Sequence, residues 1–261
     1  MLKLCVAGAT GRMGQAIIAE ATTKGHQITG ATEAPNNPAV GKSLRDFGFN
    51  SDIKISADIK KAMGDADVFI SFTTPAADLI NIPIATSFGK RIILGTTGFT
   101  AEQNKQIIAT MSDKVPAVFS PNYSIGVNIL FKLAEQLNAF PQNYDFSINE
   151  IHHIDKKDAP SGTAKKLSEI ISSVRGYTKT ISGREGISPR QPQELEVTTF
   201  RAGGIAGIHD LIVAGPNEML RIEHTAFNRN VFAQGAVYAA EWLSHQATPK
   251  IYSMADVLGL N

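Results

Sequence analysis

One short apolar run followed directly by three glycines constrains the fold of this 261-residue chain more than any other feature. The run covers residues 2–7, and Gly8, Gly11 and Gly14 follow it, ahead of apolar residues at helical spacing. Strand, glycine turn and helix in this order are typical of a dinucleotide-binding unit. Gly8 permits the tight turn, Gly11 lets a pyrophosphate approach the backbone, and Gly14 lets the helix pack on the strand. Thr10 stands where the commonest pattern has its second glycine.

Four further apolar runs indicate that this unit continues as an open parallel sheet. They cover residues 27–32, 68–72, 91–94 and 115–120. Ligands of doubly wound sheets bind at the carboxyl ends of the strands, where small polar residues follow the last three runs. We therefore expect the glycine turn, Phe72 and residues 95–98 to line one crevice. Side chains there that can hydrogen-bond a nicotinamide amide or a substrate carboxylate are Thr96, Thr97 and Asn122.

Glu33 lies at the end of the second run, roughly 20 residues past the glycine turn, where an acid typically binds the adenosine ribose hydroxyls. Its carboxylate repels a 2′-phosphate, and the neighbours Ala34 and Pro35 bring no cation to offset that repulsion. NADH is therefore the expected cofactor. NADPH is the alternative, because Lys42 can reach back from the following loop. The competing interpretation makes Glu33 an exposed loop acid that binds no ligand.

Residues 150–167 bring histidines, lysines and a Ser-Gly-Thr turn together at a predicted strand-to-helix junction. The start of a helix offers unpaired N–H groups and a partial positive charge, which suit an anion. Lys156 adds a cation, and His152 or His153 can move a proton near neutral pH. The segment therefore predicts a site for a carboxylate-bearing substrate. If the strand continued through both histidines, their rings would point to opposite faces, and only one would share a site with Lys156.

The bland interpretation of this segment is that Ser161 and Thr163 only cap a helix and that the histidine pair is structural. The residue types alone do not separate the two interpretations.

A second, smaller domain is expected to begin after residue 123. Residues 125–140 are apolar and helical, residues 175–194 read as a long mobile loop, and three runs follow that predict an antiparallel meander. Those runs are 195–201, 208–214 and 219–227.

A last amphipathic helix over residues 232–243 resembles the first half in composition and is expected to return to it. The predicted fold is α/β: a Rossmann-type doubly wound parallel sheet plus a smaller α+β domain with an open mixed or antiparallel sheet. The predicted domains are 1–123 for the dinucleotide, 124–229 for substrate binding and oligomerisation, and 230–261 returning to the first.

The composition excludes some partners. The formal net charge of +1 gives no global attraction to nucleic acid or to an anionic membrane, and no apolar run approaches the ~20 residues that cross a bilayer. Cys5 is the one cysteine, and no signal-peptide pattern precedes it, which favours the reducing cytoplasm. No His, Cys and carboxylate spacing indicates a metal site. Small molecules are the expected partners.

The glycine turn, the Gly-Thr-Thr-Gly-Phe motif at residues 95–99 and the string from His152 to Ala164 resemble the 4-hydroxy-tetrahydrodipicolinate reductase family. The resemblance covers essentially the whole chain. It implies an NAD(P)H-dependent enzyme that reduces (2S,4S)-4-hydroxy-2,3,4,5-tetrahydrodipicolinate to 2,3,4,5-tetrahydrodipicolinate with loss of water. That reaction belongs to the diaminopimelate route of lysine biosynthesis. The resemblance also implies a homotetramer built through the second sheet.

The resemblance assigns roles to individual residues. It implies that His152 is the general acid/base and that Lys156 is the proton donor. Substrate-binding positions are His153, Ser161, Gly162, Thr163 and Thr97. Cofactor contacts are Gly8, Ala9, Thr10, Gly11, Arg12, Met13, Glu33, Gly95, Thr96, Thr97, Ser120, Pro121, Asn122 and Tyr123. Ala34 and Thr74 stand where some members carry arginine, which disfavours recognition of a 2′-phosphate.

Two other functions fit the same fold. One is a non-enzymatic sensor of nicotinamide nucleotides, and the other is a reductase of another small acid. The sensor predicts cofactor binding without turnover, and it gives no reason for histidines and Lys156 beside an anion-binding turn.

Overall fold

The computed structural model describes residues 1–260 as two compact units. Unit 1 consists of Met1–Ile125 together with the chain from Asn230 onward, and unit 2 consists of Gly126–Arg229. The chain thus leaves unit 1 once and comes back to it.

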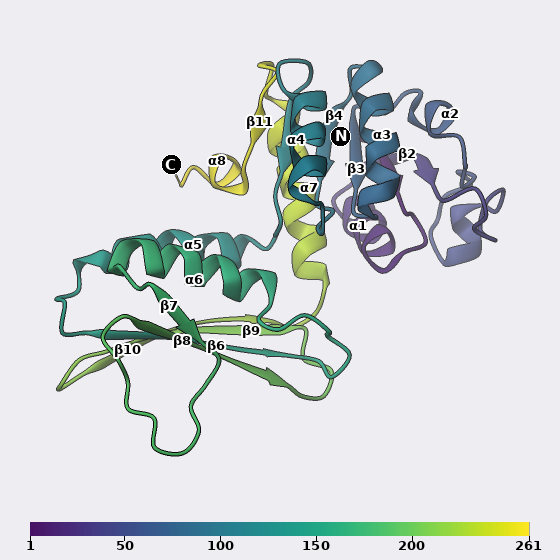
Figure 1. The fold of residues 1–261 in the computed structure, drawn as a ribbon. Helices are drawn as coiled ribbons and strands as arrows, with labels where there is room; N and C mark the ends of the chain where they lie inside the picture. Colours follow the sequence, from purple (N-terminus) through teal and green to yellow (C-terminus); the bar gives the residue numbers. More distant parts are fainter. Residues whose placement is uncertain (261) are drawn as a thin grey trace. The chain divides into compact units, whose positions relative to one another are not determined.

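A six-stranded, all-parallel sheet forms the centre of unit 1 (Figure 1). The strand order is β11-β5-β4-β3-β1-β2, which is doubly wound, so the predicted Rossmann-type fold is confirmed. The strands are β1 (Lys3–Ala7), β2 (Gln27–Thr32), β3 (Val68–Ser71), β4 (Arg91–Leu94), β5 (Ala117–Phe119) and β11 (Ile251–Tyr252). Strand β11 is too short to show a period, and it was not expected.

Helices cover both faces of this sheet because successive side chains of each strand point in opposite directions. In β1, Leu4 and Val6 belong to one hydrophobic cluster, and Cys5 and Ala7 belong to another. The first cluster includes α1 (Arg12–Thr23), α7 (Asn230–Ser244) and α8 (Met254–Leu258). The second includes α2 (Ile59–Met63), α3 (Pro75–Ser87) and α4 (Ala101–Met111). A 3₁₀ turn, η1 (Leu44–Phe47), follows β2.

Unit 2 is a five-stranded mixed sheet with two helices packed side by side on one face (Figure 1). The strand order is β10-β9-β6-β8-β7. The strands are β6 (Asp145–His152), β7 (Lys179–Ile181), β8 (Glu194–Arg201), β9 (Gly207–Ala214) and β10 (Met219–Ala226). The helices are α5 (Ile125–Gln136), extended by the 3₁₀ turn η2 (Leu137–Ala139), and α6 (Gly162–Arg175).

The expected antiparallel meander is wrong at its first strand. Strands β9 and β10 pair antiparallel, but β8 pairs in parallel with β6, which lies between β8 and β9. The reason is the helix α6, which carries the chain back along the sheet so that β8 runs in the direction of β6. Consecutive apolar runs show strands but not which strand inserts between them.

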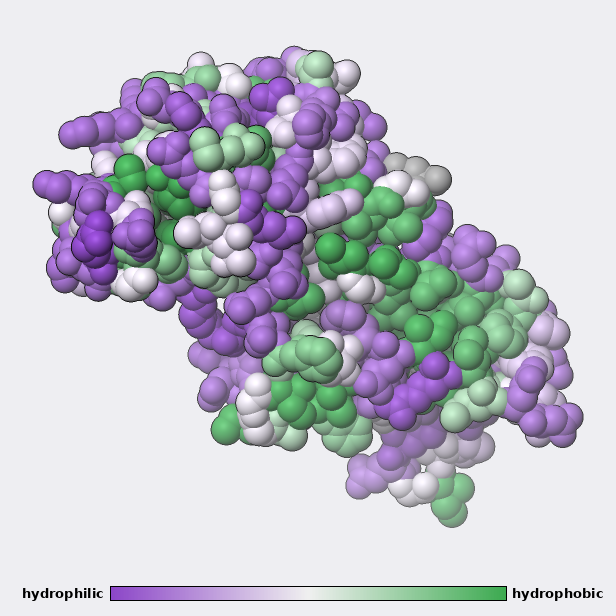
Figure 2. All heavy atoms as spheres, turned by 180° about the vertical axis from the view of Figure 1, so that it is seen from behind, coloured by the Kyte–Doolittle hydropathy of each residue, from purple (hydrophilic) through white to green (hydrophobic). Residues whose placement is uncertain are grey.

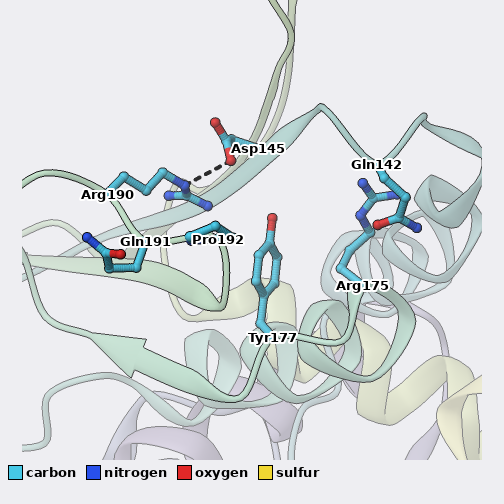
Figure 3. A pocket seen from close by; sticks show the side chains of 7 residues that line it. All are labelled: Gln142, Asp145, Arg175, Tyr177, Arg190, Gln191 and Pro192. Atoms are coloured by element: carbon cyan, nitrogen blue, oxygen red, sulfur yellow. Dashed lines mark hydrogen bonds and ion pairs between the residues drawn. The ribbon is translucent and has the colours of Figure 1, made fainter.

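The segment 175–194 is also more ordered than the predicted loop. It contains β7, which pairs in parallel with β8. Arg184 donates to Glu194 and Glu196 over 3.0 and 3.1 Å, and Arg190 donates to Asp145 over 2.9 Å. Figure 3 shows the Arg190–Asp145 pair in a polar pocket of ≈ 320 Å³ that also contains Tyr177. Asp145 begins β6 and His152 ends it, so this pocket lies about 23 Å along the strand from His152.

Across residues 1–260, no helix is long and apolar enough to cross a membrane.

Candidate functional site

The glycine turn of unit 1 has the backbone that a dinucleotide site needs. Gly8 has φ +65°, which side-chain-bearing residues rarely adopt, and its carbonyl accepts a hydrogen bond from the N–H of Gly11 over 2.9 Å. A Cβ at Gly14 would lie 2.0 Å from that same carbonyl, so only glycine lets α1 approach the turn. The turn therefore leads directly into the N-terminus of α1, where a pyrophosphate is stabilised. These residues fit a bound nicotinamide dinucleotide.

Glu33 lies against the glycine turn. One oxygen of its carboxylate accepts hydrogen bonds from the Thr10 N–H, over 2.8 Å, and from the Thr10 hydroxyl, over 2.6 Å. Thr10 replaces the usual second glycine and uses its side chain to hold this acid. Among residues 1–260, no ion pair to Glu33 is found within 4.0 Å.

The carboxyl ends of β3 and β4 are joined to each other. The N–H of Thr73 donates to the Thr96 hydroxyl over 2.8 Å, and a Cβ at Gly95 would lie 2.1 Å from the Phe72 ring. Thr96 is buried, whereas Thr97 is exposed. Thr96 therefore links the two strand ends, and Thr97 is the threonine that presents its side chain to solvent.

The segment 120–123 after β5 likewise contains both buried and exposed residues. Tyr123 is 1% exposed, and its hydroxyl donates to the carbonyls of Val118 and Leu94 over 2.8 and 3.1 Å. The centroid of its ring lies 5.1 Å from that of Phe72, so its side chain belongs to the packing behind these strand ends. Ser120 is buried and donates to the carbonyl of Asn122 over 2.9 Å. Pro121 is exposed, as are Gly11 and Arg12.

In unit 2, one face of the strand β6 has apolar core residues at its start and polar residues at its end. Phe146 and Ile148 are fully buried in the cluster with α5 and α6, and Glu150 and His152 continue the same alternation. Both polar side chains are buried, at 0% and 8% exposed. His153 follows the end of the strand and is half-buried, with its Nε2 accepting from Arg229 over 3.5 Å. The two histidines therefore lie in different surroundings.

Glu150 carries an ionised carboxylate inside the protein. Its Oε1 accepts from the Ser161 N–H at 3.0 Å, the Thr199 hydroxyl at 3.2 Å and the Arg201 guanidinium at 3.0 Å, and its Oε2 lies 2.5 Å from His152 Nδ1. Burial by itself raises the pKa of Glu150, but the hydrogen bonds from His152, Arg201 and Ser161 outweigh it and hold the pKa well below the usual range.

The Ser-Gly-Thr turn forms the start of α6. Ser161 caps the helix by accepting from the Ala164 N–H over 3.2 Å, and its hydroxyl lies 3.2 Å from His209 Nε2. The backbone N–H of Ser161 donates to Glu150, so both the N–H and the hydroxyl of Ser161 already have partners within the protein. Gly162 faces open space, since a Cβ there would meet nothing within 4 Å. The exposed Gly162 and the half-buried Thr163 are thus the positions of the turn that face solvent.

Lys156 lies in the loop between β6 and α6. Its ammonium is 2.8 Å from Asp158 Oδ1, and its side chain is 21% exposed. Burial opposes ionisation of Asp158, but the hydrogen bond from Lys156 outweighs it and lowers the pKa of that carboxyl. The same loop is held by Arg201, which donates to the carbonyls of Lys156 and Asp158 over 3.3 and 2.6 Å.

Glu150, His152 and His209 also bring three ligand-type atoms within 4.8 Å of one another, which no sequence spacing indicated. A cation there would compete with the Arg201 guanidinium for a carboxylate that already accepts from four groups. We therefore assign no metal to this cluster.

Sequence reasoning gave no role to Glu150, His209 or Asp78. Glu150 precedes His152 by two residues, which is the period of a strand, and that signal was available. His209 comes from β9, and only the pairing of β9 with β6 shows that it lies opposite Glu150. Asp78 is fully buried in α3, where its carboxylate accepts from Ser71 over 2.6 Å beneath the end of β3.

His209 makes the stability of the protein depend on pH. Burial lowers its pKa to about 3, with a further contribution from His152 opposed by Glu150, while His224 and Lys156 act in the same direction as burial. A histidine in the unfolded chain titrates near 6.5, so the unfolded state binds more protons below that pH. Stability is fully present above about 6.5 and is lost as the pH falls toward 3.

We predict that the free energy of unfolding falls by about 2 kcal/mol between pH 7.5 and pH 5 because of this one residue. Chemical denaturation at both pH values measures it. His209→Gln should reduce the pH dependence by that amount, and His245→Gln, at an exposed histidine, should leave it unchanged. If the free energy of unfolding of His209→Gln still changed with pH as it does in the unmodified protein, His209 would not be the source of the pH dependence.

Comparison with known proteins identifies the family of this chain. A family model described as dihydrodipicolinate reductase, N-terminus, matches residues 2–123, and one described as dihydrodipicolinate reductase, C-terminus, matches residues 126–258. Proteins named 4-hydroxy-tetrahydrodipicolinate reductase from Methanosarcina acetivorans and Citrifermentans bemidjiense are 42% and 40% identical to this chain, with 100% of each chain covered.

Solved structures share the fold. A dipicolinate-bound dihydrodipicolinate reductase from Paenisporosarcina sp. TG-14 matches with a TM-score of 0.77 at 22% identity, covering 98% of both chains. A myo-inositol dehydrogenase from Lactobacillus casei, in complex with NAD(H) and myo-inositol, matches with a TM-score of 0.61 at 16% identity, covering 100% of this chain and 91% of that one. With both halves matched by its models and full-length relatives above 40% identity, this chain belongs to the dihydrodipicolinate reductase family.

Proposed function

We propose that this protein is a reductase that converts (2S,4S)-4-hydroxy-2,3,4,5-tetrahydrodipicolinate to 2,3,4,5-tetrahydrodipicolinate with loss of water, in the diaminopimelate route to lysine. The single observation that carries the proposal is the arrangement at the end of β6. A buried, carboxylate-paired His152, the ammonium of Lys156 and the open N-terminus of α6 belong to one loop and its flanking elements. That set combines proton transfer with binding of an anion.

The residues divide into two tasks. The substrate carries two carboxylates, which suit Lys156 and the backbone N–H groups at the start of α6, around Gly162 and Thr163. Bound nicotinamide supplies the hydride, and the glycine turn with Glu33 would hold it in unit 1. Reduction of the substrate also requires a proton, which His152 or Lys156 delivers as general acid. His153 and Thr97 are assigned to the substrate by the same proposal.

We propose the same division for the domains. Residues 1–123 bind the dinucleotide, residues 124–229 bind the substrate and make the subunit contacts, and residues 230–261 complete the first domain.

The single cysteine, Cys5, is buried, and burial raises the pKa of its thiol to about 12. A free, unreactive thiol fits the cytoplasm, and cell fractionation tests this location.

The first test is Lys156→Ala with freshly prepared hydroxy-tetrahydrodipicolinate. Turnover should fall ~10²-fold or more if the ammonium binds or protonates the substrate, while the dissociation constant of NADH stays nearly unchanged, since Lys156 lies in unit 2. The adjacent exposed lysine provides a matched control, and Lys157→Ala should keep full turnover. Binding of NADH by the unmodified protein without turnover would instead indicate a sensor.

The second test concerns the cofactor. We propose that NADH is used at least as well as NADPH, because the Glu33 carboxylate meets a 2′-phosphate as a like charge and the exposed Ala34 brings no guanidinium. Ala34→Arg should lower the Michaelis constant for NADPH and leave that for NADH nearly unchanged. A preference of tenfold or more for NADPH in the unmodified protein, about 1.4 kcal/mol, would overturn this account of Glu33.

We propose a homotetramer formed through the sheet of unit 2. The face away from α5 and α6 carries a row of apolar side chains in register, with Phe200 on β8, Ile151 on β6 and Ile208 on β9. Phe200 is 55% exposed. Seen from behind, unit 2 also has hydrophobic residues gathered at its surface on the side where α5 lies (Figure 2). Burial of such a face requires a partner, and a second copy offers the same surface.

Sedimentation of the unmodified protein should therefore give a mass four times the 28.0 kDa of the chain. Phe200→Lys should produce smaller species, because a charge would be buried in the contact. Phe88→Lys, at a similarly exposed phenylalanine of unit 1, is the control and should keep the tetramer. A monomeric unmodified protein would refute the proposal.

A further inference from the structure

Glu150 joins several elements of unit 2. It is fully buried on the central strand β6, where it pairs with His152 of the same strand and accepts from groups on two other elements, the start of α6 and the strand β8. Its partner Arg201 also donates to the carbonyl of Lys156, which the proposed function uses. The position of this one carboxylate therefore affects His152, the loop of Lys156 and the start of α6.

The ionised state of Glu150 decides how His152 is oriented. A carboxylate accepts hydrogen bonds and donates none, so the Nδ1 atom that lies 2.5 Å from it must carry a proton. The other nitrogen, Nε2, is then the one that exchanges a proton with a substrate. A Cβ at position 207 would lie 3.0 Å from Nε2, and Gly207 places no side chain there. The ring is thus held through Nδ1, and the residue next to Nε2 has no side chain.

Arg201, which pairs with Glu150, also holds the loop that contains Lys156. One Arg201 nitrogen donates to Glu150 over 3.0 Å and to the Asp158 carbonyl over 2.6 Å, while another donates to the Lys156 carbonyl over 3.3 Å. The guanidinium therefore connects the buried carboxylate to the loop that carries the lysine. The Ser161 N–H connects the same carboxylate to the turn that opens α6.

We propose that Glu150 is a positioning residue of the reaction: it holds His152 with its proton on Nδ1 and, through Arg201, sets the loop of Lys156. The proposal rests on the proposed reductase function for its kinetic consequences. Its structural consequence, the position of the proton on His152, does not depend on that function.

A merely structural ion pair would behave differently, and the same sheet contains a matched control. Glu194 on β8 is 4% exposed and is paired with Lys179 at 2.8 Å and Arg184 at 3.0 Å. It is likewise a nearly buried carboxylate held by cations, but no histidine contacts it among residues 1–260. Glu194→Gln therefore reports the effect of losing a buried ion pair alone.

The decisive experiment compares Glu150→Gln with Glu194→Gln in the full-length protein. Glu150→Gln should lower kcat ~10²-fold with little change in NADH affinity, and it should shift the pH–rate profile of kcat. The titratable groups that contact His152 are Glu150, at Nδ1, and His209, whose ring centroid lies 5.1 Å from that of His152, and the charged Arg201 pairs with Glu150. Glu194→Gln should lower the melting temperature only. A Glu150→Gln enzyme with kcat within twofold and an unmoved profile would overturn the proposal.

Two further measurements cover a Glu150→Gln chain that fails to fold or a chain that lacks reductase activity. Glu150→Asp keeps the charge but shortens the side chain, so it should fold and still lose kcat, because the carboxylate no longer reaches Nδ1. In the unmodified protein labelled with ¹⁵N-histidine, NMR should find the His152 proton on Nδ1. A neutral His152 with its proton on Nε2 would reject the positioning role whatever the activity, whereas Nδ1 protonation in an inactive protein would reject only the proposed reaction.

Discussion

The polar core of unit 2 depends on one buried negative charge. Removing a carboxylate from water costs several kcal/mol, and that cost is tolerated only where hydrogen bonds and a countercharge replace the solvent. Glu150 meets this condition with four donors, one of which is the Arg201 guanidinium. Because these donors belong to β6, β8 and the start of α6, the same interactions that make the charge tolerable also fix the elements of the site relative to one another.

The nucleotide-binding unit is built on a different constraint, which is backbone geometry. Its strands are all parallel, so their carboxyl ends lie at one edge and the loops that follow them meet there. The loops then hold one another: Thr10 binds Glu33, Thr73 binds Thr96, and the ring of Phe72 fills the space left by Gly95. The buried side chain of Tyr123 packs against Phe72 and donates to the carbonyls of Leu94 and Val118, which holds the ends of these strands together. Few residues in this unit need to be charged, because the turn and the helix N-terminus supply the interactions that a phosphate requires.

Much of the fold could be predicted because its signals are local. The glycine turn, the apolar runs and the helical spacing that follows Gly14 depend on neighbours in the chain, and β2 and β4 appear with the predicted ends. The predictions failed where pairing is non-local. The insertion of β6 between β8 and β9, and the addition of β11 to the first sheet, depend on contacts between distant segments that no periodicity records. The short β7 was hidden in a segment rich in glycine and proline for the same reason.

For the site, the sequence by itself determined which chemistry is present: a dinucleotide turn with an acid after the second strand, and histidines with Lys156 ahead of a helix start. The tertiary structure decided which of those groups face which. It separated the buried His152 from His153, committed Ser161 to its helix cap and to Glu150, and brought Arg201 and His209 in from other strands. The physical reason is that a strand's alternation says only which side chains share a face, whereas burial, pairing and protonation depend on the strands that come to lie beside it.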